Sequence, residues 1–275
     1  MKTIGFIGYG QMNRMLVEGF LQAYALDPKQ VIISTRTRDN VTSLIERYPD
    51  IILAEDNREV AKVADLLIIG VKPLEVAGVL KEISGIRGEE NHIISIAACV
   101  STDLISHFHP GKITRILPSV CSTVGEGISL CYHHPSVDPE SATFVEELFS
   151  SISTVKKVDE GLFEPAGDLM SCAPALLSRM FLEFASAGSR HSSLTIDECL
   201  EMVVSTVFGT ALMLQDGVSP EDLITRVATP GGITEEGVKI LEKDLPAVFD
   251  RLFETTLSKY DLVKKRVADT SRQNI

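Results

Sequence analysis

Apolar and polar residues follow different patterns in the two parts of the chain. Up to residue 158, short continuous apolar runs alternate with segments whose apolar residues are spaced three and four apart. The first pattern is typical of strands buried on both faces of a sheet, and the second is typical of amphipathic helices. The predicted strands are residues 3–8, 31–35, 51–53, 65–71, 92–98, 112–118, 126–133 and 153–158, with predicted helices at 13–26, 39–48, 57–64, 74–84, 101–108 and 140–152. This alternation predicts a parallel sheet covered by helices on both faces, the doubly wound α/β architecture.

From residue 160 onward the pattern is helical only. The predicted helices are residues 174–192, 195–217, 219–228, 235–243 and 245–269. Thr195 and Glu198 form a capping-box pattern at the start of the second of these helices, and Gly217 is suited to end it. The helices are strongly apolar over much of their circumference, so we expect an all-helical domain that buries surface against a partner subunit. We therefore predict an N-terminal domain of residues 1–159 and a helical dimerisation domain of residues 160–275.

Composition narrows the class of protein. The 275 residues are 44% apolar and 23% charged, with a net charge of −12 and no basic cluster, which argues against nucleic acid or an anionic membrane as a partner. The chain begins without a signal-peptide pattern, and its apolar runs are too short to span a bilayer. The five cysteines are scattered, without a C-x-x-C pair, which indicates reduced thiols, no zinc site and a cytoplasmic location.

A glycine turn near the N-terminus predicts a dinucleotide site. Gly8 and Gly10 come directly after the first predicted strand and open the first predicted helix. Gly8 permits a tight turn and Gly10 lets the backbone approach a pyrophosphate, while the helix N-terminus supplies amides and a positive dipole end. The third glycine of the usual motif is Asn13 here. A purely structural turn is the alternative, but the position at the first strand of a βαβ alternation favours a Rossmann-type nucleotide-binding domain.

The end of the second predicted strand indicates which dinucleotide is bound. An NAD site usually has an acidic residue there for the ribose hydroxyls, whereas this chain has Ser34, Thr35, Arg36, Thr37 and Arg38. Arginines and hydroxyls suit a 2′-phosphate, so NADPH is favoured over NADH. The alternative is a solvated loop with ordinary arginines.

Residues able to donate a proton to a carbonyl substrate are scarce in the second half. No lysine occurs between Lys157 and Lys239 and no tyrosine between Tyr132 and Tyr260. The histidines at 133, 134 and 191 stand in polar turns and are predicted to be surface residues. Hydride transfer to a carbonyl needs such a donor, but an imine can be protonated beforehand. The composition therefore favours a C=N reductase. The late turn Pro230-Gly231-Gly232, which runs into a helix start, is suited to binding a small anion.

Several motifs occur in order at spacings that resemble pyrroline-5-carboxylate reductase, the last enzyme of proline biosynthesis. They are IGFIGYGQM, DNREVAKVADLLIIGVKP, ISIAACVS, ITRILPSVCSTVGEGIS and ATPGGIT, and they span most of the chain. The resemblance implies cofactor contacts from Gly8, Gly10, Gln11, Met12, Ser34, Thr35, Arg36, Asn57, Val71, Lys72, Pro73, Ala97 and Ala98. It implies substrate contacts from Ser171, Pro230, Gly231, Gly232 and Thr234, with Thr234 as the catalytic residue that reaches the ring nitrogen and the glycine amides holding the substrate carboxylate. It also implies a homodimer, often assembled further into decamers.

Departures from the family pattern cluster in the segments implied to meet the substrate. The family turn Met-Pro-Asn-Thr-Pro is replaced by residues 117–121, Leu-Pro-Ser-Val-Cys, and Ser-Gly-Ser-Gly-Pro-Ala-Tyr by residues 170–176, Met-Ser-Cys-Ala-Pro-Ala-Leu. Ile233 stands where many members have a small or hydroxylated residue. We expect Cys121 and Cys172 to fill pocket walls rather than act as redox centres. Three functions stay open: reduction of pyrroline-5-carboxylate to proline, action on a different imine or carbonyl, and a non-catalytic NADP-binding sensor.

Overall fold

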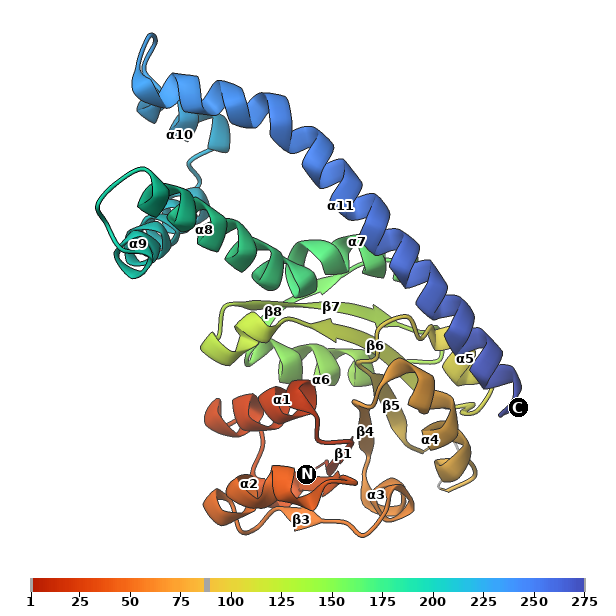
Figure 1. Ribbon diagram of the computed structural model, residues 1–275. Coiled ribbons are helices and arrows are strands. Elements are labelled where there is room, and N and C mark those ends of the chain that lie inside the picture. Colours follow the sequence, from red (N-terminus) through yellow and green to blue (C-terminus); the bar gives the residue numbers. More distant parts are fainter. Residues whose placement is uncertain (1, 87–89, 275) are drawn as a thin grey trace. The chain divides into compact units, whose positions relative to one another are not determined.

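The computed structural model describes residues 2–86 and 90–274 (Figure 1). Contacts divide the chain into two compact units. The sheet unit comprises residues 1–172 together with 256–275, and the helical unit comprises residues 173–255. The boundary after residue 159 was predicted from a change of sequence pattern, whereas these two units are defined by contacts. The predicted division into a nucleotide-binding domain and a dimerisation domain therefore stays a prediction.

One eight-stranded sheet organises the sheet unit, in the order β3-β2-β1-β4-β5-β6-β7-β8. The strands are β1 (Ile4–Ile7), β2 (Val31–Ser34), β3 (Ile52–Leu53), β4 (Leu66–Ile69), β5 (His92–Ser95), β6 (Lys112–Pro118), β7 (Gly127–His133) and β8 (Ser153–Lys157). The doubly wound α/β class is confirmed, and β1 to β6 pair in parallel as expected. The next strand, β7, departs from the parallel arrangement and pairs antiparallel with β6. The only helix between them is the short 3-10 helix η4 (Val120–Val124), and a parallel neighbour would need a longer crossover.

Alternate residues of the strands enter two different cores. Ile4 and Phe6 of β1 join one cluster and Ile7 joins the other, as the two-residue period of a strand requires. The first cluster is covered by α1 (Gln11–Gln22), α2 (Thr42–Arg47) and α6 (Pro139–Ser150). The second is covered by α3 (Asn57–Val63), α4 (Val76–Ile83), α5 (Thr102–Ser106) and Val267 near the C-terminus (Figure 1). The sheet is therefore covered on both faces. The ends of its strands are the places where it can contribute to a binding site.

The helical unit contains α8 (Ala173–Arg190), α9 (Ile196–Gln215), α10 (Pro220–Val227) and the first part of α11 (Ile233–Arg272). The side chains of Thr195 and Glu198 cap α9 reciprocally, and Gly217 beyond its end has φ +93°, so both predictions are confirmed. The expected break before residue 245 was wrong, because α11 is continuous through Pro246. A proline removes one backbone hydrogen bond, and the turns on either side keep theirs.

A buried polar network crosses the middle of the sheet. His92 Nε2 lies 2.8 Å from Thr114 Oγ1, which lies 2.8 Å from His133 Nδ1. His133 Nε2 also lies 3.2 Å from a carboxylate oxygen of Glu146. His133 was predicted to be a surface residue, which is wrong because it belongs to β7 and is half-buried. Burial lowers the pKa of His92 to about 3, so this ring stays neutral.

No helix in the described part of the chain is both long and apolar enough to span a membrane.

Candidate nucleotide site

The turn from β1 to α1 has the geometry of a phosphate cradle. Gly8 has φ +84°, a conformation that favours glycine, and its N–H donates to Ser34 O at 2.9 Å. Gly10 is the N-cap of α1, makes no side-chain cap and has open space where a Cβ would stand. The first turn of α1 carries no acidic side chain. The helix amides therefore face a site where the backbone can approach an anion, and these residues fit a dinucleotide pyrophosphate.

Asn13 is a structural part of this turn, which sequence reasoning had treated only as a missing glycine. Its side chain is fully buried, and its Nδ2 donates to Gly8 O at 2.7 Å and to Ile7 O at 3.3 Å. A Cβ on Gly70 would clash with that Nδ2. Asn13 thus holds the cradle in place through these hydrogen bonds. It leaves no room for a side chain at Gly70, directly after β4. Two features of the sequence together could have indicated this contact: a residue larger than glycine at position 13 and a glycine at position 70.

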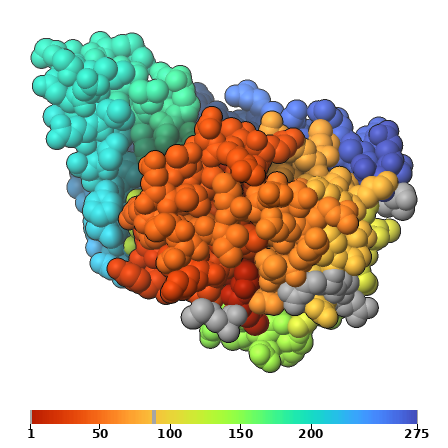
Figure 2. Space-filling model, turned by 90° about the horizontal axis from the view of Figure 1, so that it is seen from below, coloured from red at the N-terminus to blue at the C-terminus, as the bar shows by residue number. Residues whose placement is uncertain are grey.

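A cavity of about 530 Å³ opens beside the cradle at the carboxyl ends of β1, β2 and β4. Ligands of doubly wound sheets bind at this edge, where the strand order reverses. Eight of the sequence-predicted cofactor residues line the cavity, namely Gly8, Gly10, Ser34, Thr35, Arg36, Asn57, Val71 and Lys72. In Figure 2 the orange segments, which hold β2, α2 and α3, form much of the visible surface of the sheet unit. The structure therefore brings most of the predicted cofactor residues around one space.

The other predicted cofactor residues lie nearby without lining this cavity. Pro73 begins the 3-10 helix η3 (Pro73–Glu75) that follows β4. Ala97 and Ala98 follow β5 in a turn where Cys99 adopts φ +63°, a conformation uncommon for a residue with a side chain. Both segments stand at the same edge of the sheet as the cavity.

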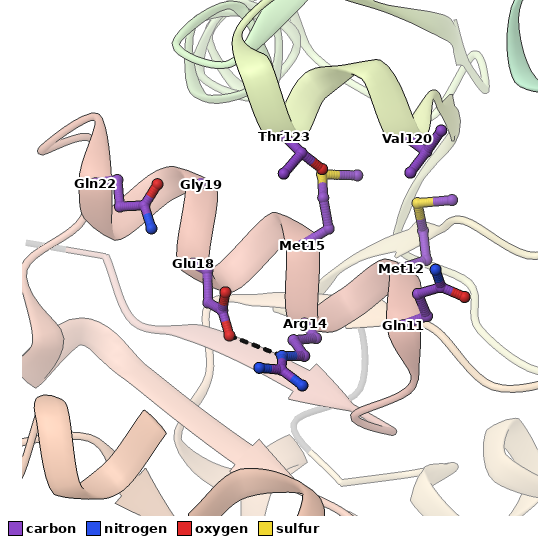
Figure 3. A pocket seen from close by; sticks show the side chains of 9 residues that line it. All are labelled: Gln11, Met12, Arg14, Met15, Glu18, Gly19, Gln22, Val120 and Thr123. Carbon is purple, nitrogen blue, oxygen red and sulfur yellow. Dashed lines mark hydrogen bonds and ion pairs between the residues drawn. The ribbon is translucent and has the colours of Figure 1, made fainter. Parts of the chain in front are cut away.

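Gln11 and Met12 line a second cavity of about 570 Å³, between α1 and η4 (Figure 3). Met12 and Met15 of α1 lie toward Val120 and Thr123 of η4, and Arg14 pairs with Glu18 along the helix (Figure 3). η4 contains part of the segment that departs from the family pattern. The start of α1 therefore lies between the nucleotide cavity and this altered segment.

Two acidic residues line the nucleotide cavity and were not foreseen. Ser34 Oγ donates to Asn57 Oδ1, and Asn57 Nδ2 donates to Glu82 Oε2 at 2.7 Å. Arg36 Nη2 donates to Glu75 Oε1 at 2.8 Å. The spacing of Lys72 and Glu75 around a proline, which suits a capped turn, could have indicated Glu75. Two of the residues predicted for the adenosine end, Arg36 and Asn57, are thus oriented by carboxylates.

The two departing segments of the sheet unit contact each other. Ser119 Oγ donates to Met170 O at 2.8 Å, and Ser171 Oγ donates to Pro118 O at 3.3 Å. Ser171 lies in a π-helical stretch, Asp168–Cys172, a feature frequent at functional sites. The hydroxyl of Ser171, predicted to bind substrate, therefore has a backbone acceptor in the structure. Two hydrogen bonds therefore join the two altered segments.

The thiol of Cys172, in the second altered segment, has the environment of an unreactive cysteine. Cys172 Sγ lies 3.3 Å from the hydroxyl of Tyr260, and burial raises the pKa of this thiol. A raised pKa disfavours the thiolate, which is the reactive form. Among the described residues, no group of three histidine, cysteine or carboxylate side chains could hold a metal ion.

The turn of residues 229–234 lies in the helical unit, and the amides of Gly231 and Gly232 already have acceptors. Gly231 N–H donates to Glu235 Oε2 at 2.9 Å and Gly232 N–H donates to Thr229 O at 2.8 Å. The Gly231 hydrogen bond, followed by the charge of Lys239, lowers the pKa of Glu235. Thr234 is exposed in the first turn of α11. A carboxylate is therefore already the ligand of one predicted amide.

Comparisons with known proteins extend over both units. A family model described as "Pyrroline-5-carboxylate reductase dimerisation" matches residues 160–262, and one described as "NADP oxidoreductase coenzyme F420-dependent" matches residues 3–99. The chain is 34% identical over 97% of its length to a Bacillus subtilis (strain 168) protein named pyrroline-5-carboxylate reductase 3, covering 98% of that relative.

Solved structures agree in fold. The structure of 1-pyrroline-5-carboxylate reductase from Streptococcus pyogenes superposes with a TM-score of 0.84 at 25% identity, covering 96% of this chain and 98% of that one. The NADP-bound pyrroline carboxylate reductase of Plasmodium falciparum gives 0.81 at 21% identity, covering 98% of each chain. With its glycine cradle and two matched family regions, the chain is an oxidoreductase and belongs to the pyrroline-5-carboxylate reductase family.

Proposed function

We propose that this protein is an NADPH-dependent reductase of a cyclic imine, with pyrroline-5-carboxylate as substrate and L-proline as product. The observation that carries the proposal is the 34% identity to pyrroline-5-carboxylate reductase 3 across nearly the whole of both chains. The scarcity of proton donors in the second half of the sequence supports an imine rather than a carbonyl. The protein would act as a homodimer in the cytoplasm.

The residues around the nucleotide cavity would hold NADPH. The uncapped start of α1, behind Gly8 and Gly10, would bind the pyrophosphate through backbone amides. Ser34 and Asn57 would position the adenosine ribose, and Arg36 would pair with the 2′-phosphate. NADPH supplies the hydride that reduces the imine carbon.

The turn of residues 230–234 would bind the substrate carboxylate. The Gly231 amide already holds the carboxylate of Glu235, which supports the suitability of this backbone for such a group. A substrate carboxylate would replace Glu235 at that amide. The Thr234 hydroxyl would hydrogen-bond the imine nitrogen or the carboxylate and orient it, and Ser171 would contribute from the altered segment.

The test is oxidation of NADPH by the purified protein with pyrroline-5-carboxylate, followed by identification of proline. Thr234→Val removes the hydroxyl at almost constant volume, and Thr234→Ser retains it. We expect a loss of about 10- to 100-fold in kcat/KM for the valine variant, the value of one or two hydrogen bonds to an ionic substrate, with recovery in the serine variant. Turnover no faster than without enzyme would refute the proposal.

A second candidate keeps the cofactor and changes the substrate to another imine or a carbonyl compound. The departures from the family pattern favour it, because two hydrogen bonds, from Ser119 to Met170 and from Ser171 to Pro118, join the two altered segments and a change in one therefore affects the other. A panel of cyclic imines and keto acids separates the two candidates. NADPH binding without turnover of any member of the panel would instead indicate a sensor.

A further inference from the structure

The nucleotide cavity contains an ion pair across its wall. Arg36 follows β2 and Glu75 ends η3, so the two residues come from different βα connections. The arginine side chain is 83% exposed and that of Glu75 is 34% exposed. Both line the cavity that contains the glycine cradle. The proposed partner of the 2′-phosphate therefore already has an anionic partner.

Glu75 is held in place independently of Arg36. Its second carboxylate oxygen, Oε2, accepts the backbone N–H of Lys72 at 3.3 Å, and Pro73 fixes the turn between them. If Arg36 moved to a phosphate, Glu75 would stay oriented by this turn. Its charge would then remain in the cavity beside the bound dianion.

We propose that Glu75 is a specificity-determining residue that competes with the 2′-phosphate for Arg36 and so narrows the preference for NADPH over NADH. The inference rests on the proposed function, because it takes Arg36 as the 2′-phosphate ligand. NADH leaves the Arg36–Glu75 pair intact, since its ribose carries an uncharged hydroxyl. NADPH must break the pair before it gains the arginine.

The size of the competition follows from the exposure of the pair. Solvent-exposed ion pairs contribute at most about 1 kcal/mol, so Glu75 weakens NADPH binding by up to about fivefold. The 2′-phosphate carries close to two negative charges and forms a charge-assisted bidentate contact with an arginine, so it still displaces the carboxylate. The protein is therefore expected to bind both dinucleotides, with NADP favoured only moderately.

The test measures binding of oxidised NADP and NAD by calorimetry without substrate, so that turnover has no influence. Glu75→Gln keeps an acceptor for the Lys72 amide and removes the charge. We expect this variant to bind NADP about three- to fivefold more tightly, with NAD unchanged. The fragments 2′,5′-ADP and 5′-AMP should repeat the difference, which places the effect at the adenosine end.

Two further variants separate competition for Arg36 from a general effect of charge. Glu82→Gln removes the same charge from the same cavity, but Glu82 accepts from Asn57 and holds no arginine of the 2′-phosphate site. In an Arg36→Ala background the gain from Glu75→Gln should fall to the size of the gain from Glu82→Gln, which reports only the general effect of charge in this cavity. An equal gain from Glu75→Gln with and without Arg36 would overturn the inference.

The inference and the proposed function fail in different ways. Binding of NADP and NAD with a ratio that Glu75→Gln leaves unchanged would overturn only the role of Glu75. If the unaltered protein bound neither dinucleotide, the proposed function would fail and the inference would fail with it.

Discussion

At the scale of single residues, the cradle depends on Asn13 and Gly70, a pair that is not part of the usual glycine motif. The buried Asn13 amide occupies the space that a side chain on Gly70 would need. We expect Gly70→Ala to lower the free energy of unfolding by about 1–3 kcal/mol through overpacking and to weaken dinucleotide binding by displacing Asn13 from Gly8. Denaturant unfolding and calorimetric titration measure the two effects.

Gly161→Ala is the matched control, because a Cβ there would meet no atom within 4 Å. Equal stability and binding for the two variants would show that Asn13 can move aside without consequence.

A second prediction at this scale concerns His92, whose pKa burial lowers to about 3. An unfolded histidine titrates near 6.5, so below this pH the unfolded state binds a proton that the folded state does not accept. Stability is therefore retained above pH 6.5 and lost as the pH falls toward 3. Lowering the pH from 6.5 to 5 should cost about 1.6 kcal/mol from this residue.

Denaturant unfolding at several pH values, comparing the natural protein with His92→Asn, measures this dependence. The variant should lose most of the slope between pH 6.5 and 5 and keep a smaller one from His133, whose pKa burial also lowers. An unchanged slope in the variant would show that residues other than His92 cause the acid sensitivity.

At the scale of elements, a buried ion-pair cluster fixes the C-terminal end of α11 to the sheet unit. Glu164 lies 3.0 Å from Arg115 and 2.9 Å from Lys264 of α11. Burial acts to raise the pKa of Glu164, but the hydrogen bonds from Lys264 and Arg115 outweigh it and lower the pKa. We expect Glu164→Gln to destabilise the protein by about 1–3 kcal/mol, because Lys264 and the buried Arg115 lose a charged partner, while Arg115 keeps its pair with Glu160.

Hydrogen exchange should show faster opening of residues 256–272 in the same variant. Asp269→Asn is the control on the same segment, because Asp269 forms an exposed pair with Arg272 that should contribute at most about 1 kcal/mol. Similar losses for both variants would contradict the anchoring role of the cluster.

Some features of the helices and strands can be predicted from the sequence, and others cannot. The βα alternation and the nucleotide cradle could be predicted because periodicity and glycine chemistry are local properties. The antiparallel pairing of β7 also has a local cause, because the connection between Pro118 and Gly127 is too short for a parallel crossover. Pro246 suggests a helix end, but the flanking turns carry α11 across it. The Arg36–Glu75 pair joins positions 39 residues apart, which no local pattern indicates.

At the scale of the whole molecule, the helical unit leaves large apolar side chains uncovered. They include Phe184, Met202, Val204, Phe208, Val227, Ile240 and Leu241. Contiguous exposed apolar surface is costly in water and marks interaction sites. The match of residues 160–262 to a family dimerisation model supports a second copy of this chain as the partner.

Phe208, which is 67% exposed on α9, provides the test of that dimer. We expect Phe208→Glu to weaken the dimer by at least about 30-fold, the consequence of losing a 2 kcal/mol anchor and burying an unpaired charge. Sedimentation velocity over a range of protein concentrations measures the change. Tyr24→Glu places the same charge on an exposed aromatic residue of the sheet unit and should leave the dimer intact. A dimer that buries these side chains should make the thermal stability of the natural protein rise with protein concentration, and this dependence should be lost in Phe208→Glu but kept in Tyr24→Glu.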